Sequence, residues 1–239
     1  MGFAGTGFYA MWNGMEPAHV PEFDLMHARS HMAAHIAYLG EGAILGARRH
    51  GDGVGTLPPF FTLYDMRTLD VLTAPELRDR RVNESPWFLG LRPRYRDHIR
   101  HHCRVLARAG GGVGGSVATL LMRLTDRAAS NSGMARALCG ELLGRGPVTA
   151  AHVGLADPTL PTLVGGSRPP RSVEDEPVGV LVLESYSRHA LAAELPDIAR
   201  RVHALGIAAA APRWAHYALS LGLDYGELAA VRSLDGPPA

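Results

Sequence analysis

One order of predicted elements occurs twice in this chain and constrains its fold more than any other feature. The order is strand, helix, strand, strand, helix and strand. The first occurrence covers about residues 6 to 108, and the second covers about residues 116 to 221. Each occurrence can form a four-stranded sheet with helices on one face, which leaves the other face in need of a partner. The sequence therefore predicts an α+β protein in which two β-α-β-β-α-β units pack as an internal α+β barrel, with a cavity between the sheets.

The elements of the first unit follow from its hydrophobic runs and from its Pro and Gly residues. Pro21 suits the first turn of a helix, and Gly40 suits its end. Thr73, Ala74 and Pro75 are typical of the start of a second helix, and the Gly-rich stretch HGDGVG is predicted to join the two middle strands. The predicted elements are a helix over residues 21–39 and strands over residues 7–13, 43–49, 59–65 and 98–107.

The second unit repeats this order with fewer insertions. Its predicted elements are helices over residues 134–143 and 191–205 and strands over residues 116–124, 148–156, 178–186 and 212–221. A Pro-rich, acidic loop that ends at Pro177 is expected to be mobile. The segment 110–115 matches G-x-G-x-x-G, but a strand follows it where a dinucleotide site needs a helix. We therefore predict a first unit over residues 1–109, a flexible linker over 110–115 and a degenerate second unit over 116–239.

Composition excludes several classes of function. The chain has 24 basic and 23 acidic residues, so its charge does not favour nucleic acid or an anionic membrane as a partner. A small molecule or a protein is therefore the expected partner. All 24 basic residues are Arg, and the chain has no Lys. Schiff-base chemistry on a lysine, including that of pyridoxal phosphate enzymes and class I aldolases, is therefore excluded.

The cysteines and the N-terminal sequence bear on the compartment. Cys103 and Cys139 are too few and too far apart for a disulfide framework or a four-ligand zinc site. The N-terminus lacks a basic start followed by an apolar run, and no apolar stretch reaches about 18 residues. These features predict a reduced, cytoplasmic protein that is neither secreted nor membrane-spanning.

Several segments of the first unit resemble a known superfamily. They are WNGMEPAHVPEFDLMHARSH, GAILGARR, FFTLYDMRTLDVL and ESPWFLGLRP, all within about residues 8 to 108. They resemble the dimeric α+β barrel superfamily of ferredoxin-like proteins, which includes the EthD-like and antibiotic-biosynthesis-monooxygenase-like families. Many of these relatives have an E-F-x-x-W-Y-x-x-x-H run on the first helix. Here Glu22, Phe23 and His31 occupy the matching positions, and Met26 and His27 replace the aromatic pair.

The resemblance implies two ferredoxin-like units in tandem. Single-unit relatives build the barrel from two chains, whereas a tandem chain would close it internally, as relatives of the haem-containing chlorite dismutases do. Such a chain could pair further as a homodimer.

Three histidines on the first predicted helix form the main candidate site. His27, His31 and His35 are spaced i, i+4 and i+8, so they form one stripe. At about 100° per residue the stripe lies about 110° from the apolar face that includes Met32 and Ile36, which places it beside that face and not within it. Three interpretations stay open. The stripe is solvated or structural, or it acts in acid/base chemistry or substrate binding, or it binds a metal with further ligands from elsewhere.

The predicted strand HIRHHCR supplies a second group of candidates. Strand alternation places Arg100 and His102 on one face and His101 and Cys103 on the other. If Arg100 or His102 points into the barrel it should meet an anion or a carboxylate, because a buried charge without a partner is costly. The alternative is a strand end that is exposed to water.

Aromatic residues on the central strands form a third group. Tyr9 on the first strand should approach Tyr64 and Asp65 on the third strand, while Asn13 should lie nearer Phe60. Tyr or His as the acid and Asp as an orienting group would make a general acid/base site. The alternative is that these aromatic rings serve only in packing.

Taken together, these features predict an enzyme of small-molecule metabolism that binds an apolar or aromatic metabolite and uses histidine acid/base chemistry without an organic cofactor. A lyase, an isomerase, a cyclase or a cofactor-free oxygenase fits this description. We predict catalytic roles for His31, His27, His35, Tyr9 and His102 and substrate-binding roles for Asn13, Trp12, Tyr64, Trp87 and Arg100. The alternatives are a haem- or metal-dependent oxidoreductase, with His189 or His203 as an axial haem ligand, and a non-catalytic binding protein.

Overall fold

The computed structural model describes residues 3–38, 42–73, 85–160 and 177–228. The strands are β1 (Gly7–Met15), β2 (Ile44–Gly55), β3 (Phe60–Met66), β4 (Tyr95–Gly110), β5 (Ser116–Arg123), β6 (Val148–Ala156), β7 (Val178–Ser185) and β8 (Arg213–Asp224). The α-helices are α1 (Val20–Met26), α2 (Met32–Tyr38), α4 (Pro86–Leu91), α5 (Asp126–Ser130), α6 (Ser132–Leu143) and α7 (Arg188–Ala204). A π-helical turn, His27–His31, joins α1 to α2. Single 3-10 turns occupy Pro17–His19, Asp70–Thr73, Arg92–Arg94 and Tyr225–Glu227.

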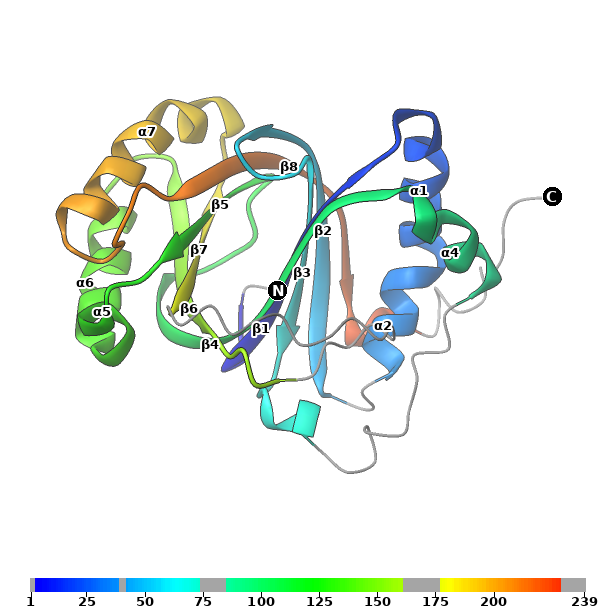
Figure 1. Ribbon diagram of the computed structural model, residues 1–239, viewed down its shortest axis with the longest axis horizontal. Coiled ribbons are helices and arrows are strands. Elements are labelled where there is room, and N and C mark those ends of the chain that lie inside the picture. The colour runs from blue at the N-terminus through cyan, green and yellow to red at the C-terminus, as the bar shows by residue number, and fades with distance from the viewer. Residues whose placement is uncertain (1–2, 39–41, 74–84, 161–176, 229–239) are drawn as a thin grey trace.

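The strands form one closed barrel in the order β1, β3, β2, β8, β5, β7, β6 and β4. Every neighbouring pair is antiparallel. The order contains two four-stranded sheets with the same connections, β4-β1-β3-β2 and β8-β5-β7-β6, which join where β2 meets β8 and where β4 meets β6 (Figure 1). The predicted fold is confirmed, because two ferredoxin-like units form an α+β barrel within one chain. A second chain is not needed to close it.

The β2 strand is longer than the sequence predicted because it pairs with the other unit. The prediction ended this strand at Arg49 and assigned HGDGVG to a loop, which is wrong. Gly51 lies opposite Ala218 of β8, so the Gly-rich stretch forms part of the seam between the units. The register shifts between Gly51 and Val54, where Asp52 has a left-handed φ of 52°, as expected for a β-bulge that absorbs an extra residue.

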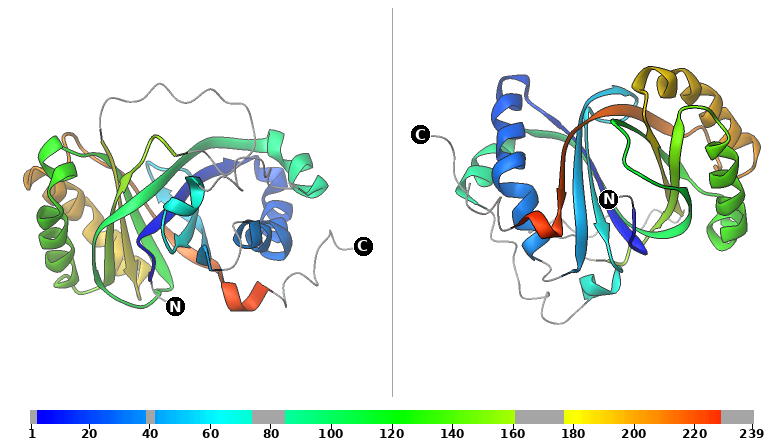
Figure 2. Two further views of the ribbon diagram at one scale, coloured as in Figure 1. Left: turned by 90° about the horizontal axis from the view of Figure 1, so that it is seen from below. Right: turned by 180° about the vertical axis from the view of Figure 1, so that it is seen from behind.

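Helices cover the outer faces of both sheets. The helix formed by α1, the π-helical turn and α2 lies on the first sheet with α4 beside it, while α5, α6 and α7 lie on the second sheet at the opposite side of the barrel (Figures 1 and 2). Under α6 and α7 the second sheet is covered only by apolar side chains in the described cluster, among them Leu120, Leu138, Leu181, Leu195 and Ile198. The two outer faces therefore differ in chemistry, because only the first sheet packs histidines under its helix in the described part of the chain.

The interior between the sheets is filled by apolar and aromatic side chains where the sequence predicted the binding cavity. Phe8, Trp12, Phe61 and Tyr217 are fully buried there, together with Val117, Val180, Val182 and Ala215. The Trp12 indole N–H donates to Thr119 Oγ1 at 3.0 Å and so links the two units. Most of this space therefore serves as the core that holds the barrel together.

A buried ion pair also joins the units inside the barrel. Arg48 of β2 donates from Nη1 to Glu184 Oε1 of β7 at 2.5 Å, and their side chains are 9% and 0% exposed. The second carboxylate oxygen of Glu184 accepts the backbone N–H of Gly114 at 3.1 Å. Both charges are thus compensated within the protein, as burial of a charge requires.

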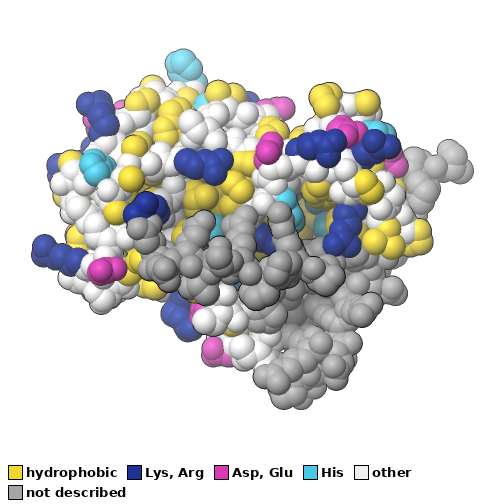
Figure 3. All heavy atoms as spheres, viewed as in Figure 1, with side chains coloured by type: hydrophobic (Ala, Val, Ile, Leu, Met, Phe, Trp, Pro, Cys, Tyr) yellow, Lys and Arg dark blue, Asp and Glu magenta, His cyan; other side chains and the backbone are white. Residues whose placement is uncertain are grey.

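Two predicted segments lie outside the described residues. They are the second helix of the first unit beyond Thr73, which falls in residues 74–84, and most of the Pro-rich acidic loop, which falls in residues 161–176. Among the helices that the structure describes, none has the length and apolar character needed to cross a membrane. Basic, acidic and hydrophobic side chains are interspersed on the face shown in Figure 3.

Candidate functional site

The first helix buries its histidine stripe against the sheet. His27, His31 and His35 are only 0%, 7% and 3% exposed, so their predicted position beside the buried face is wrong. The reason is the π-helical turn, in which the Met32 N–H bonds to the carbonyl of His27, five residues earlier. Such a turn holds more residues than an α-helical turn. The rotation of about 100° per residue that the prediction assumed therefore does not hold through His27–His31.

The outer face of the first sheet brings further predicted residues together under this helix. The register places Tyr9 opposite Tyr64 of β3 and opposite His102 of β4, as the sequence predicted for the two tyrosines. Because side chains alternate along a strand, Asn13 shares the face of Tyr9, and Arg100 shares the face of His102. Burial raises the pKa of Tyr9, and the neighbouring Arg100 guanidinium partly offsets this rise.

Aromatic and imidazole rings form a continuous path from the helix to the sheet. The ring centroids are 4.8 Å apart for His27 and His31, 4.3 Å for His31 and His35, and 5.4 Å for His35 and Tyr64. The path continues from Tyr64 to Tyr9 over 5.9 Å and from Tyr9 to His102 over 4.3 Å. We call these six residues the ring cluster, namely His27, His31, His35, Tyr64, Tyr9 and His102.

Buried polar atoms without a partner gather in and next to the ring cluster. Within the described part of the chain, these atoms include Asn13 Oδ1, His27 Nε2, Arg49 Nη1, Thr62 Oγ1, Tyr64 Oη and His102 Nε2. Both ring nitrogens of His50 and of His152 are also unpaired, but these two rings lie toward the barrel interior, against Phe61 and Phe3. Each unsatisfied buried polar atom costs about 1–3 kcal/mol. Buried polar atoms are normally paired, so their concentration under one helix marks a place where the polar atoms of a ligand can bind.

One of these atoms is a proton acceptor with a defined tautomer. His27 Nδ1 lies 2.9 Å from the carbonyl oxygen of Phe23, which can only accept a hydrogen bond. The proton of the neutral ring is therefore on Nδ1, and the lone pair is on Nε2. His27 Nε2 thus has the protonation state of a general base.

The surroundings keep the ring cluster uncharged near neutral pH. Burial, aided by the charge of Arg49 and by the neighbouring imidazoles, lowers the pKa of His27 and of His31 well below the usual range. Burial alone lowers the pKa of His35 to about 4, and burial with nearby Arg100 lowers the pKa of His102 to about 3. Burial also raises the pKa of the Tyr64 hydroxyl. The cluster therefore offers neutral proton acceptors beside neutral hydroxyl donors.

Two neighbours of the ring cluster, Arg49 and Thr62, were not predicted from the sequence. Arg49 of β2 holds its guanidinium over the rings of Phe23 and Phe60, at 4.3 and 4.7 Å from their centroids. Thr62 lies opposite Arg49 on β3. Phe88 of α4 stacks on His31 at 4.4 Å. The Arg-Arg pair in GAILGARR could have indicated Arg49, because side chains alternate along a strand and one of the two arginines must therefore lie on each face of the sheet.

Other predicted residues lie away from the ring cluster. Trp12 points into the barrel interior, on the opposite face of β1. Asp65 is also on that opposite face, where its carboxylate accepts the backbone N–H groups of Ala4 and Gly5 at 2.9 and 3.0 Å. It is therefore not the orienting group that the sequence suggested for Tyr9. Trp87 donates its indole N–H to Glu22 Oε1 at 2.9 Å on the outer side of the helix.

The predicted alternative ligands for haem lie apart from the ring cluster. His189 and His203 are both exposed on α7, on the second unit, whereas the ring cluster lies under the first helix. His27 and His35 are two helical turns apart, about 11 Å along the axis, whereas zinc lies about 2 Å from each nitrogen ligand. Among the described residues no three His, Cys, Asp or Glu side chains are placed to share one metal ion.

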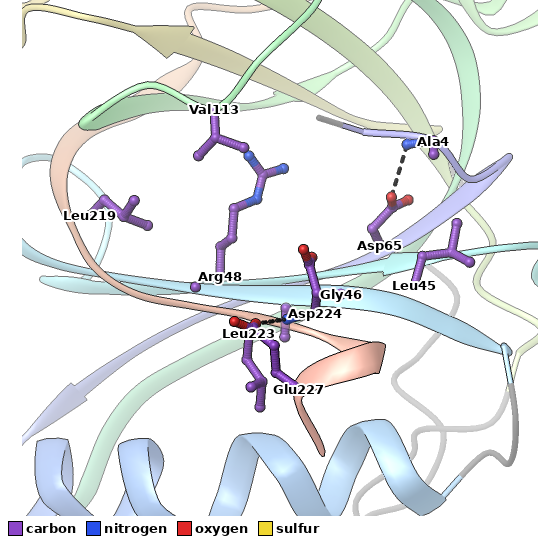
Figure 4. A pocket seen from close by; sticks show the side chains of 12 residues that line it. Ala4, Leu45, Gly46, Arg48, Asp65, Val113, Leu219, Leu223, Asp224 and Glu227 are labelled. Atoms are coloured by element: carbon purple, nitrogen blue, oxygen red, sulfur yellow. Dashed lines mark hydrogen bonds between the residues drawn. The ribbon is translucent and has the colours of Figure 1, made fainter. Parts of the chain in front are cut away.

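A separate pocket of about 260 Å³ opens between β2, β8 and Val113 (Figure 4). Its polar side chains have partners within the protein. Arg48 has its ion pair with Glu184, Asp65 binds backbone N–H groups, and Glu227 accepts the Asp224 N–H at 2.8 Å. None of the described residues that line the pocket has an unpaired buried polar atom of the kind found in the ring cluster.

Comparison with known proteins supports the fold. An anthrone oxidase-like protein matches 95% of this chain and 97% of its own length, with a TM-score of 0.60 and 12% sequence identity. A proposed monooxygenase from Fusobacterium nucleatum matches 92% of this chain and 95% of its own length, with a TM-score of 0.54 and 6% identity. A proposed chlorite dismutase matches 95% of this chain and 99% of its own length, with a TM-score of 0.51 and 10% identity.

The comparison of structures finds similar proteins, whereas the comparison of sequences does not. No protein-family sequence model and no curated protein sequence matches the chain. At identities this low the structural similarity establishes the fold, the tandem ferredoxin-like α+β barrel, and confirms the resemblance at that level. What the protein does has to follow from its own site.

Proposed function

We propose that this protein is an enzyme that oxidises a small aromatic molecule with O2, by histidine acid/base chemistry and without an organic cofactor, at the ring cluster. The observation that supports this most strongly is the gathering of unpaired buried polar atoms among neutral imidazole and phenol groups under the first helix. The rings of His31 and Phe88, stacked with 10° between their planes, offer an aromatic ligand a flat surface. Similarity to an anthrone oxidase-like protein and to a proposed monooxygenase favours an oxygenase over a lyase, isomerase or cyclase.

The protein would carry out the proton transfers. His27 Nε2 takes a proton from an activated methylene group or a phenol of the substrate, because it is the acceptor with a fixed tautomer. The low pKa of His27 in the free enzyme makes it a weak base, but a substrate anion formed beside the new imidazolium stabilises the charged ring and raises its pKa. His31 lies next to His27 and is positioned to pass the proton on. Tyr64 can donate its unpaired hydroxyl to a developing oxyanion.

The oxidation itself requires only the substrate and O2. The substrate carbanion transfers one electron to O2, the two radicals combine to a peroxide, and the peroxide loses water to leave a carbonyl group. One oxygen atom enters the product and the other leaves as water, while the substrate supplies all four electrons. For a methylene group between two aromatic rings, the methylene and one O2 molecule give one carbonyl group and one water molecule, so atoms and electrons balance.

The test is O2 uptake by chelator-treated protein with a hydroxylated anthrone as the substrate. We expect one O2 to be consumed per anthrone and one atom of ¹⁸O to appear in the carbonyl product when ¹⁸O2 is supplied. The same reaction without protein corrects for spontaneous oxidation of the anthrone. Uptake no faster than in this blank, or uptake that appears only after haem or metal is added, would contradict the proposal.

A further inference from the structure

Arg49 is a buried cation whose charge is only partly compensated. Its side chain is 2% exposed, and its ion-pair partner, Asp24, is 49% exposed. Nε and Nη2 of Arg49 both donate to Asp24 Oδ1, at 3.3 and 2.8 Å. The remaining nitrogen, Nη1, is buried and has no partner among the described residues. A buried guanidinium normally uses its full set of donors, so Nη1 is available to a ligand.

The preceding residue provides an internal comparison. Arg48 faces the barrel interior and pairs with Glu184, whose side chain is fully buried, so that charge is neutralised inside the protein. Arg49 faces the ring cluster, and Asp24 is the one carboxylate among the described residues that acts on it. Its neutral neighbours include His27 and His31 of the helix, His50 of β2 and Tyr64 of β3. The charge of Arg49, next to the ring cluster, is therefore offset among the described residues only by the half-exposed carboxylate of Asp24.

A second unpaired polar group lies directly across the sheet from Arg49. Thr62 pairs with Arg49 in the register of β2 and β3, is fully buried, and has no partner for its Oγ1 among the residues described. Side chains at directly opposed positions have Cβ atoms about 5 Å apart. The two side chains thus begin side by side on the outer face of the sheet, and an anionic ligand that enters between the helix and the sheet has both a guanidinium N–H and a hydroxyl available to it. The rings of Phe23 and Phe60 flank the guanidinium and exclude water from it.

We infer that the substrate is an aromatic molecule with an anionic oxygen, a carboxylate or a phenolate, and that Arg49 Nη1 and Thr62 Oγ1 bind this oxygen. This inference rests on the proposed function and adds the substrate class to it. The anion would complete the charge compensation of Arg49 that Asp24 begins. It would also place the aromatic body of the substrate among the rings of the helix, beside His27 and His31.

The experiment compares charged and neutral probes of the same shape. The binding of 1-naphthoate and 1-naphthamide, and of 4-nitrophenolate and 4-nitroanisole, is measured by titration calorimetry at pH 8. A charge-assisted hydrogen bond in a buried site predicts that the wild-type protein prefers the anion of at least one pair by roughly 10- to 100-fold. The pair that shows the preference distinguishes a carboxylate from a phenolate.

Variants assign the preference to the residues. We expect Arg49→Met to abolish it, Thr62→Val to reduce it, and Arg49→Lys to retain part of it. Arg104→Met is the matched control, because Arg104 is 57% exposed and makes only a long contact of 3.9 Å with Asp157 among the described residues. Arg49→Met should fold, since it removes a buried charge and leaves Asp24 at the surface; its melting temperature checks this.

Three outcomes would overturn the anion site. The wild-type protein could bind both members of each pair equally, it could bind none of the probes, or its preference for the anion could survive the Arg49→Met substitution. The proposed oxidation would be unaffected by these outcomes, because O2 uptake with the anthrone is measured independently. If the wild-type protein prefers the anion but shows no O2 uptake with the anthrone, the anion site is supported and the proposed oxygenase activity is refuted.

Discussion

Replacing His27 with Phe is expected to lower kcat/KM for anthrone oxidation by about 100-fold or more. A positioned general base contributes roughly 10²- to 10⁴-fold, and His27 Nε2 is the acceptor whose tautomer the Phe23 carbonyl fixes. The Phe ring keeps the contacts with Phe23 and His31 but has no lone pair. The substitution removes an unpaired buried nitrogen but also the hydrogen bond to the Phe23 carbonyl, so these two effects offset each other and the melting temperature should change little.

The control for this variant is His189→Phe, because His189 is exposed on α7, on the opposite side of the barrel. Oxygen-electrode rates over a range of anthrone concentrations separate kcat from KM. A His27→Phe enzyme that keeps more than about half of the wild-type kcat/KM would show that this imidazole is not the base, and His31 or His102 would have to replace it.

We expect the protein to unfold in mild acid, near pH 5. Burial lowers the pKa of seven histidines in the folded state. The pKa falls to about 4 for His35 and His152, to about 3 for His50 and His102, well below the usual range for His27 and His31, and below its ordinary value for His216. The unfolded chain binds these protons near pH 6.5, so stability is full above that pH and falls as the pH drops below it. His35 alone accounts for about 3 kcal/mol once both states are titrated.

Several such groups together can offset a large part of the stability of an ordinary domain, which is about 5–15 kcal/mol. Asp65 and Glu184 act in the opposite direction, because burial raises their pKa, but they are fewer than the histidines. Circular dichroism at 222 nm across pH 3 to 8 measures the transition, and His102→Phe should move the midpoint to lower pH. A wild-type midpoint below pH 4 would show that the histidines are solvated in the folded state.

The sequence predicted the fold well because the patterns that define it are local. The apolar run of β7 and the Pro and Gly residues around the first helix indicate their elements without knowledge of the partners. The extent of β2 was not predictable in this way, since pairing with Ala218 on the other unit turns a Gly-rich stretch into a strand.

The sequence predicted several members of the site but not the side of the sheet on which they lie. Alternation correctly grouped Arg100 with His102, and the expected register correctly paired Tyr9 with Tyr64. Which face of each strand would meet the helix depends on how the two units close. The buried position of the histidines depended on the π-helical turn, which residue spacing does not reveal. The role of Arg49 depended on its having only a half-exposed carboxylate as its ion-pair partner in the described part of the chain.

The most direct test of the oxygenase site compares two fully buried tyrosines that lie on opposite sides of the first sheet. Tyr64 belongs to the ring cluster and its hydroxyl has no partner among the described residues, whereas Tyr217 lies in the barrel interior and donates to the Pro58 carbonyl at 3.1 Å. The measurement is O2 uptake with the hydroxylated anthrone by Tyr64→Phe and by Tyr217→Phe. We expect Tyr64→Phe to lower kcat about tenfold or more and Tyr217→Phe to leave kcat within about twofold while lowering stability by about 1 kcal/mol. Loss of turnover in Tyr217→Phe with normal turnover in Tyr64→Phe would place the chemistry inside the barrel and contradict the assignment to the ring cluster.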